Sequence, residues 1–162
     1  MTNIEKIGYE PVIIRFYSKE KNLLFEEKIL CAYELQTNKI VSIGNDALSY
    51  TDNTEIYVCN PLKFEAVADY IVFNQIMKSF FEKLPRKFTK HSKVAFCIQV
   101  LNFTEVELKA FTEAFKTVVK PDFWVVKKSF LELCEENSDE IMDNAKYFVE
   151  FVSGYYLSEY YM

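Results

Sequence analysis

In the first third of the chain, short apolar runs alternate with polar turns. "PVIIRFY" (residues 11–17) is rich in β-branched and aromatic residues, and a polar "SKEKN" separates it from "LLFEEKILCAYEL". Two such runs joined by a short polar stretch predict a β-hairpin. "KIVSIGNDA", which contains the turn pair Gly44-Asn45, and "EIYVCNP", which Pro61 ends, predict two further strands.

Helical periodicity begins after Asp69, a suitable N-cap, and continues to Pro85. "TEVE" (residues 104–107) has the form of a capping box and predicts a second helix that ends before Pro121. Apolar side chains at helical spacing define one face of each helix. They are Tyr70, Phe73, Met77, Phe80, Phe81 and Leu84 in the first, and Leu108, Phe111, Phe115 and Val118 in the second.

Two apolar runs alternate with these helices. "KVAFCIQV" (93–100) is almost continuously apolar and predicts a buried central strand, and "DFWVVK" (122–127) predicts the next strand. "LELCEEN" predicts a loop or short helix, and residues 138–160 predict a terminal helix. Its apolar face would carry Ile141, Ala145, Phe148, Val149 and Val152. Strands followed by helix–strand–helix–strand–helix predict one α/β unit with a mixed sheet of about five strands.

Composition narrows the class of protein. The chain has 162 residues, half of them hydrophobic, which suits one domain with a sizeable core. A net charge of −5 without a basic stripe argues against nucleic-acid binding. No run has signal-peptide or transmembrane character, so we expect a cytoplasmic protein with no integral membrane segment. Four widely spaced cysteines among apolar neighbours predict buried free thiols: Cys31, Cys59, Cys97 and Cys134.

Candidate chemistry is sparse. Only three glycines occur, too far apart for a phosphate-binding loop or a dinucleotide motif. The single histidine, His91, lies in the basic loop 86–93 without an evident catalytic partner, and we interpret it as solvent-exposed. The acidic stretch around Glu132–Glu140 lacks the pattern of a calcium loop and favours a helix start instead. The tyrosine-rich "GYYLSEYYM" fits an interface or core packing equally well.

Four motifs in order resemble a known family. "VSIGNDA", "NPLKFEAVADYIVFNQIMKSFF", "AFCIQVLNFTEVELKAFTEAF" and "FWVVKKS" are similar, at matching spacing, to segments in the first domain of MreB-type bacterial actins. These rod-shape-determining proteins belong to the superfamily of actins, heat-shock chaperone ATPases and sugar kinases. The resemblance runs from about residue 6 to residue 131. It implies a single actin-like (ribonuclease H-like) lobe over residues 1–162, with residues 138–162 as a C-terminal helix that completes it.

The family's first phosphate loop, "DLGTxNT", corresponds here to "KIGYEPV". Lys6 stands where the family has its metal-associated Asp, Gly8 is retained, and Tyr9 replaces a small residue. Glu10 would place a negative charge where phosphate oxygens lie, which Coulomb repulsion disfavours. The resemblance therefore implies a degenerate phosphate site.

The family's Glu-Glu-Pro motif, which positions the hydrolytic water, corresponds to Lys127, Lys128 and Ser129. A lysine cannot accept a hydrogen bond from that water. The sequence also stops where the family's second phosphate loop and second lobe would begin. We therefore expect no ATP hydrolysis, no cofactor, no metal and no catalytic residue.

These expectations favour a non-catalytic protein that acts through protein–protein contacts in the bacterial cytoskeleton or in cell shape. Its partner would be a full-length bacterial actin, another protein, or a second copy of itself. One alternative is a ribonuclease H-like nucleotide-binding protein or enzyme with a diverged site, which would need clustered carboxylates at strand ends. Another is a homodimeric structural module.

Overall fold

The computed structural model describes residues 11–63, 66–67, 70–84, 93–99, 105–116, 123–136 and 139–152. Several predicted features therefore lie outside the described residues. These are the helix caps Asp69 and Thr104, the end of the second helix at Val118, the basic loop with His91, and the tyrosine-rich segment after residue 152.

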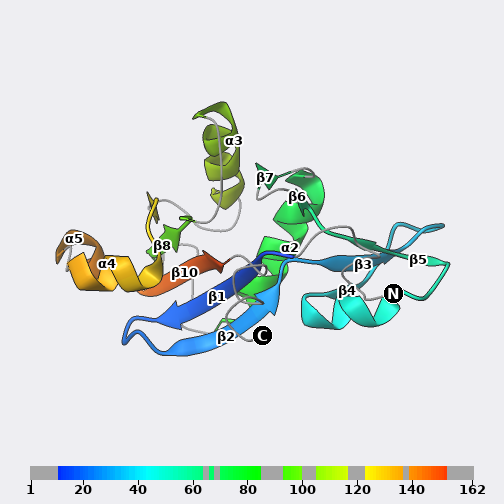
Figure 1. Ribbon diagram of the computed structural model, residues 1–162, viewed down its shortest axis with the longest axis horizontal. Coiled ribbons are helices and arrows are strands. Elements are labelled where there is room, and N and C mark those ends of the chain that lie inside the picture. The colour runs from blue at the N-terminus through cyan, green and yellow to red at the C-terminus, as the bar shows by residue number, and fades with distance from the viewer. Residues whose placement is uncertain are drawn as a thin grey trace, which may run out of the picture.

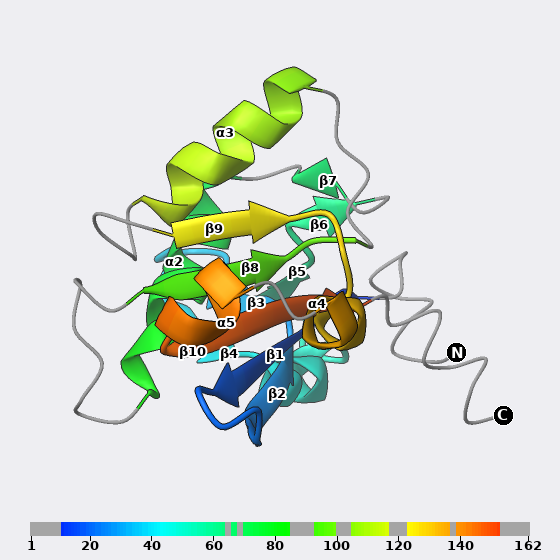
Figure 2. The ribbon, with the colours of Figure 1, turned by 90° about the vertical axis from the view of Figure 1, so that its left-hand side faces the viewer.

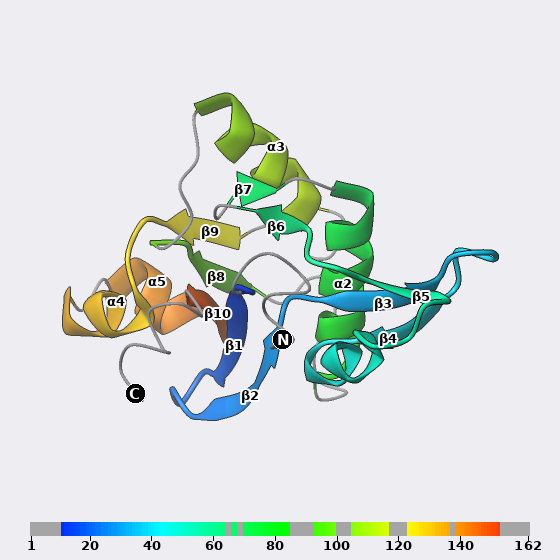
Figure 3. The ribbon, with the colours of Figure 1, turned by 45° about the vertical axis from the view of Figure 1, so that its right-hand side comes forward.

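The first third of the chain forms the predicted strands. β1 (Ile13–Ser18) and β2 (Leu23–Lys28) make the hairpin, and β3 (Cys31–Glu34), β4 (Ile40–Ile43) and β5 (Ile56–Cys59) form a separate three-stranded sheet. A 3-10 helix, η1 (Asn45–Tyr50), packs beside this small sheet. β6 (Leu62–Lys63) and β7 (Ala66–Val67) pair with each other. Figure 3 shows the small sheet projecting to one side of the main body.

Helices and strands then alternate as predicted. The order is α2 (Tyr70–Glu82), β8 (Val94–Cys97), α3 (Glu105–Phe115), β9 (Phe123–Val126) and α4 (Phe130–Glu136). "LELCEEN" is thus mostly a short helix. The predicted alternation of helix and strand is confirmed up to this point.

The terminal helix predicted over residues 138–160 is wrong. A short helix, α5 (Asp139–Asn144), gives way to a strand, β10 (Tyr147–Val152), in which all six residues are buried. A strand buried on both faces is apolar at almost every position, so it also satisfies the spacing of a helix. The β-branched and aromatic content of "YFVEFV" distinguishes the two.

β10 is the central strand of the main sheet, whose order is β2-β1-β10-β8-β9 (Figure 2). It runs antiparallel to β1 and parallel to β8, and β8 runs parallel to β9. This confirms the predicted mixed sheet of five strands. It also places β8 in the interior of the sheet, one position from the centre.

Helices cover both faces of this sheet (Figure 1). On one face, Phe16, Phe96 and Val149 pack against α2 and α3 in the larger core. On the other, Cys97 and Phe148 pack against Phe130 and Leu133 of α4 and against α5. The result is a three-layered α/β/α unit in which β10 contributes to both cores.

Candidate functional site

The candidate site lies where β9 ends and the chain turns into α4. Ser129 begins this helix as its N-cap: its Oγ accepts a hydrogen bond from the backbone N–H of Glu132 at 3.1 Å. The Glu132 carboxylate accepts a second bond, from the Gln99 side chain beyond the end of β8, at 2.7 Å. The segment Ser129–Glu132 therefore ties α4 to the ends of β8 and β9.

The two lysines before this cap make different contacts. Lys128 forms an ion pair with Glu136 at the other end of α4, and both side chains are about half exposed. Lys127 instead lines a pocket and has no ion-pair partner among the described residues. Neither side chain offers a hydrogen-bond acceptor.

That pocket is a groove of about 410 Å³ between α3 and β9. Its lining residues are Leu108, Thr112 and Lys116 of α3, Phe123 and Val125 of β9, and Ile98 and Lys127, which directly follow β8 and β9. Lys116 pairs with Glu113 on the helix at 2.9 Å. The lining of the groove is thus mixed: Ile98, Leu108, Phe123 and Val125 are apolar, and Thr112 and the two lysines are polar or charged.

A charged row crosses the opposite face of the sheet, beneath α4. Glu26, Arg15 and Glu150 occupy facing positions on β2, β1 and β10, and Cys97 and Val126 continue the row on β8 and β9. Arg15 Nε bonds Glu26 at 2.7 Å, and its Nη1 lies 4.0 Å from Glu150.

Glu150 is the buried acid of this row, with 8% of its surface exposed. Its two oxygens accept hydrogen bonds from the Tyr17 hydroxyl at 3.1 Å and from the backbone N–H of Phe130 at 2.8 Å. The carboxylate therefore connects the central strand to the first residue of α4. A buried charge with this set of partners is a structural tie, because each oxygen has a donor.

Burial and the Glu150 carboxylate raise the pKa of Tyr17 to about 12, so the hydroxyl remains a donor even above pH 10. Burial also raises the pKa of the Cys97 thiol, and Glu150 acts in the same direction. For Arg15, burial alone would lower the pKa, but the hydrogen bond and charge of Glu26 keep it above the usual value.

The predicted site residues have different outcomes. Lys127, Lys128 and Ser129 lie together at the end of β9, whereas the phosphate-loop positions Lys6, Gly8, Tyr9 and Glu10 lie outside the described residues. Across the described ranges, no three metal-ligating side chains form a group that could hold an ion. In that same part of the chain, no helix is both long and apolar enough to cross a membrane.

Sequence reasoning missed Glu150. The signal was a single acid inside the apolar run "YFVEFV", which is unusual for a buried strand.

Comparison with known proteins agrees with this architecture. The family model of the MreB/Mbl proteins matches residues 7–130. The "Cell shape-determining protein Mbl" of Bacillus cereus (strain ATCC 10987 / NRS 248) is 31% identical over 111 residues, and that of Bacillus subtilis (strain 168) is 30% identical over 112. Each alignment covers 67% of this chain and 32% of the relative, so the chain spans about a third of the length of these relatives.

Solved structures give the same result for the fold. MreB5 of Spiroplasma citri bound to ADP superposes with a TM-score of 0.60 at 20% identity, over 72% of this chain and 35% of that one. The AMPPNP-bound form gives a TM-score of 0.58 at 19% identity, over 71% and 35%. The chain has an actin-like fold, as a single partial lobe, and β10 lies beyond the segment that the family model matches. From the family match and this fold, we conclude that the chain belongs to the MreB/Mbl family.

Proposed function

We propose that this protein is a non-catalytic member of its family, which acts in the cytoplasm through protein–protein contacts in the bacterial cytoskeleton. Its partner is a full-length bacterial actin, and the contact serves cell shape. The proposal rests on one observation above all: the positions that correspond to the family's Glu-Glu-Pro motif are occupied by two lysines and a helix cap.

These side chains already have structural roles. Lys128 pairs with Glu136, and the Ser129 hydroxyl accepts the Glu132 N–H. A water held beside Lys127 would find a donor where hydrolysis needs an acceptor. This arrangement supports the absence of ATP hydrolysis. The printed names of the Mbl relatives, cell shape-determining proteins, support the cellular role.

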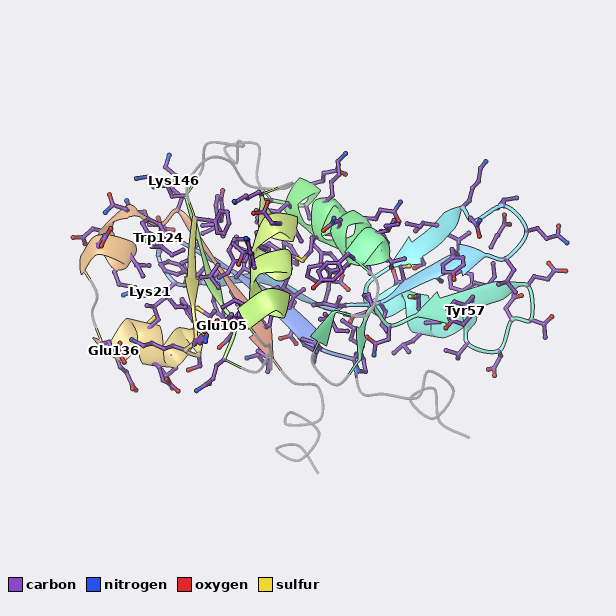
Figure 4. All side chains as sticks on the ribbon, turned by 90° about the horizontal axis from the view of Figure 1, so that it is seen from above. Lys21, Tyr57, Glu105, Trp124, Glu136 and Lys146 are labelled. Carbon is purple, nitrogen blue, oxygen red and sulfur yellow. The ribbon has the colours of Figure 1, made fainter. Side chains whose placement is uncertain are left out.

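Exposed apolar side chains suggest where a partner would bind. Leu35, Ile40, Val41 and Tyr57 of the small sheet and its loops are 36% to 54% exposed. Tyr57 lies at the end of the molecule opposite Trp124 (Figure 4). Apolar side chains that gather on one surface are typical of interaction sites. We therefore assign the filament contact to this sheet.

Two assays test the proposal. Phosphate release from MgATP should equal the buffer rate, and a faster rate would contradict the non-catalytic role. Isothermal titration should detect no micromolar binding of MgATP, and such binding would contradict the expected loss of the nucleotide site. The protein should co-sediment with polymerised bacterial actin. Tyr57→Asp with Ile40→Asp should abolish co-sedimentation, whereas Leu131→Asp, on the exposed side of α4, should not. Absence of co-sedimentation by the wild-type protein would remove the filament contact.

A further inference from the structure

Two cysteines face each other across the small sheet. Cys31 of β3 and Cys59 of β5 are direct partners in the antiparallel ladder, and neither is part of a disulfide. Side chains at directly opposite positions project from the same face, with Cβ atoms about 4.5–5.5 Å apart. Cα atoms of such pairs lie about 4.5–5.5 Å apart, inside the range that a disulfide spans. A disulfide needs Cβ atoms about 3.5–4.5 Å apart, so closing this pair requires the two residues to approach by roughly 1 Å.

The pair also lies where the small sheet packs against the main core. Cys31 and Cys59 belong to the main core, on the side of α2, whereas their neighbours Leu30, Ala32 and Val58 pack toward η1 in the core of the small sheet. A covalent bond here would lock β3 to β5 at the place where the small sheet packs against the main core. Cys31 is fully buried, and Cys59 is 9% exposed at the last position of its strand.

We propose that Cys31 and Cys59 form a reversible disulfide by exchange with a small-molecule disulfide such as oxidised glutathione. The Cys59 thiolate, at the more exposed position, attacks one glutathione sulfur and releases the first glutathione as a thiolate. The Cys31 thiolate then attacks the Cys59 sulfur of the mixed disulfide and releases the second. The two cysteines lose two electrons and two protons, and oxidised glutathione becomes two molecules of glutathione.

The other two cysteines provide an internal control. Cys97 and Cys134 pack in the core on the α4 side of the main sheet. The Cys31–Cys59 pair packs in the core on the opposite side of that sheet. Burial raises the pKa of both thiols, with the stronger effect on Cys97. A protonated thiol is a poor nucleophile, and neither Cys97 nor Cys134 faces Cys31 or Cys59, so we expect neither in the cross-linked peptides.

The test uses the full chain with oxidised glutathione at pH 8, followed by intact-mass and peptide analysis. We expect a mass loss of two hydrogen atoms, a cross-linked peptide pair containing Cys31 and Cys59, and reversal by dithiothreitol. The melting temperature should rise by about 5–10 °C, since the bond closes a loop of roughly 30 residues.

Cys59→Ala should abolish the mass loss, and the double variant Cys97→Ala/Cys134→Ala should retain it. The proposal is overturned if the wild-type mass is unchanged, if only a glutathione adduct accumulates, or if the cross-linked peptides contain Cys97 or Cys134. Peptide identification on the wild-type chain makes the result independent of whether any variant folds. Neither outcome involves actin binding, so this test is independent of the proposed filament contact.

Discussion

Arg15 and Glu150 lie directly opposite each other on β1 and β10, with Nη1 4.0 Å from Oε1. Arg15 is also bonded to Glu26, so one guanidinium joins the edge strand to the central strand. Glu150 also accepts hydrogen bonds from the Tyr17 hydroxyl and from the backbone N–H of Phe130. A polar network therefore holds α4 against the middle of the sheet.

Replacing Glu150 should strongly destabilise the fold. Glu150→Leu leaves the Phe130 N–H and the Tyr17 hydroxyl without their acceptor, and we expect a loss of about 3–5 kcal/mol in the free energy of unfolding. Urea denaturation followed by Trp124 fluorescence measures it. Glu26→Gln is the matched control, because its ion pair is half exposed and should contribute less than about 1 kcal/mol. Equal losses for both variants would refute the special role of Glu150.

Tyr17 should give the fold an alkaline pH dependence. Its pKa is raised from 10.0 to about 12, so the folded state holds the proton more tightly than the unfolded state does. The resulting stability is fully present below pH 10 and is lost as pH rises toward 12. Tyr17→Phe should flatten this part of the curve of unfolding free energy against pH. An unchanged slope would show that Tyr17 titrates normally.

Much of the sheet was predictable because strands such as "PVIIRFY" and "KVAFCIQV" are bounded by polar turns and punctuated by proline or glycine. The strand conformation of β10 was not predictable, since its apolar residues fit both a helix and a strand that is buried on both faces. The pairing of Glu150 with Arg15, and of Cys31 with Cys59, depends on which strands become neighbours and in what register. Local residue patterns do not determine that choice.

Ser129 should matter as a helix cap. Ser129→Ala removes the acceptor for the Glu132 N–H, and we expect a loss of about 1 kcal/mol in unfolding free energy. Thermal denaturation by circular dichroism suffices for the measurement. Thr54→Ala, at an exposed loop position, is the control and should change stability by less than about 0.5 kcal/mol. A neutral Ser129→Ala would mean that the cap is dispensable.

A side chain at Gly44 should destabilise the fold. Its φ is +90°, and an added Cβ would collide with the Glu27 carboxylate, which accepts the backbone N–H of Asn45 at 2.7 Å. Gly44→Ala should cost about 1–3 kcal/mol, part of it from the backbone conformation. Repeating the substitution in a Glu27→Ala background separates the cost of the collision from the cost of the backbone conformation, because only the collision disappears. No interaction between the two substitutions would place the whole cost in the backbone.

The last segment of the described chain should be indispensable. Deleting residues 138–162 removes β10, which supplies Phe148 to one core and Val149 and Phe151 to the other. We expect aggregated protein, because the main sheet would be split between β1 and β8. Size-exclusion chromatography and circular dichroism measure the outcome. A soluble, folded truncation would contradict it.

Because β10 is the central strand, the main sheet can close only late in synthesis. β1 appears early in synthesis, but its hydrogen-bonding partner β10 follows more than a hundred residues later, as the Tyr17–Glu150 separation of 133 positions illustrates. The ribosome must therefore release residues 147–152 before the main sheet can close. Until then β1 and β8 expose unpaired edges, and a nascent chain in this state would be a natural client for chaperones that bind extended apolar segments.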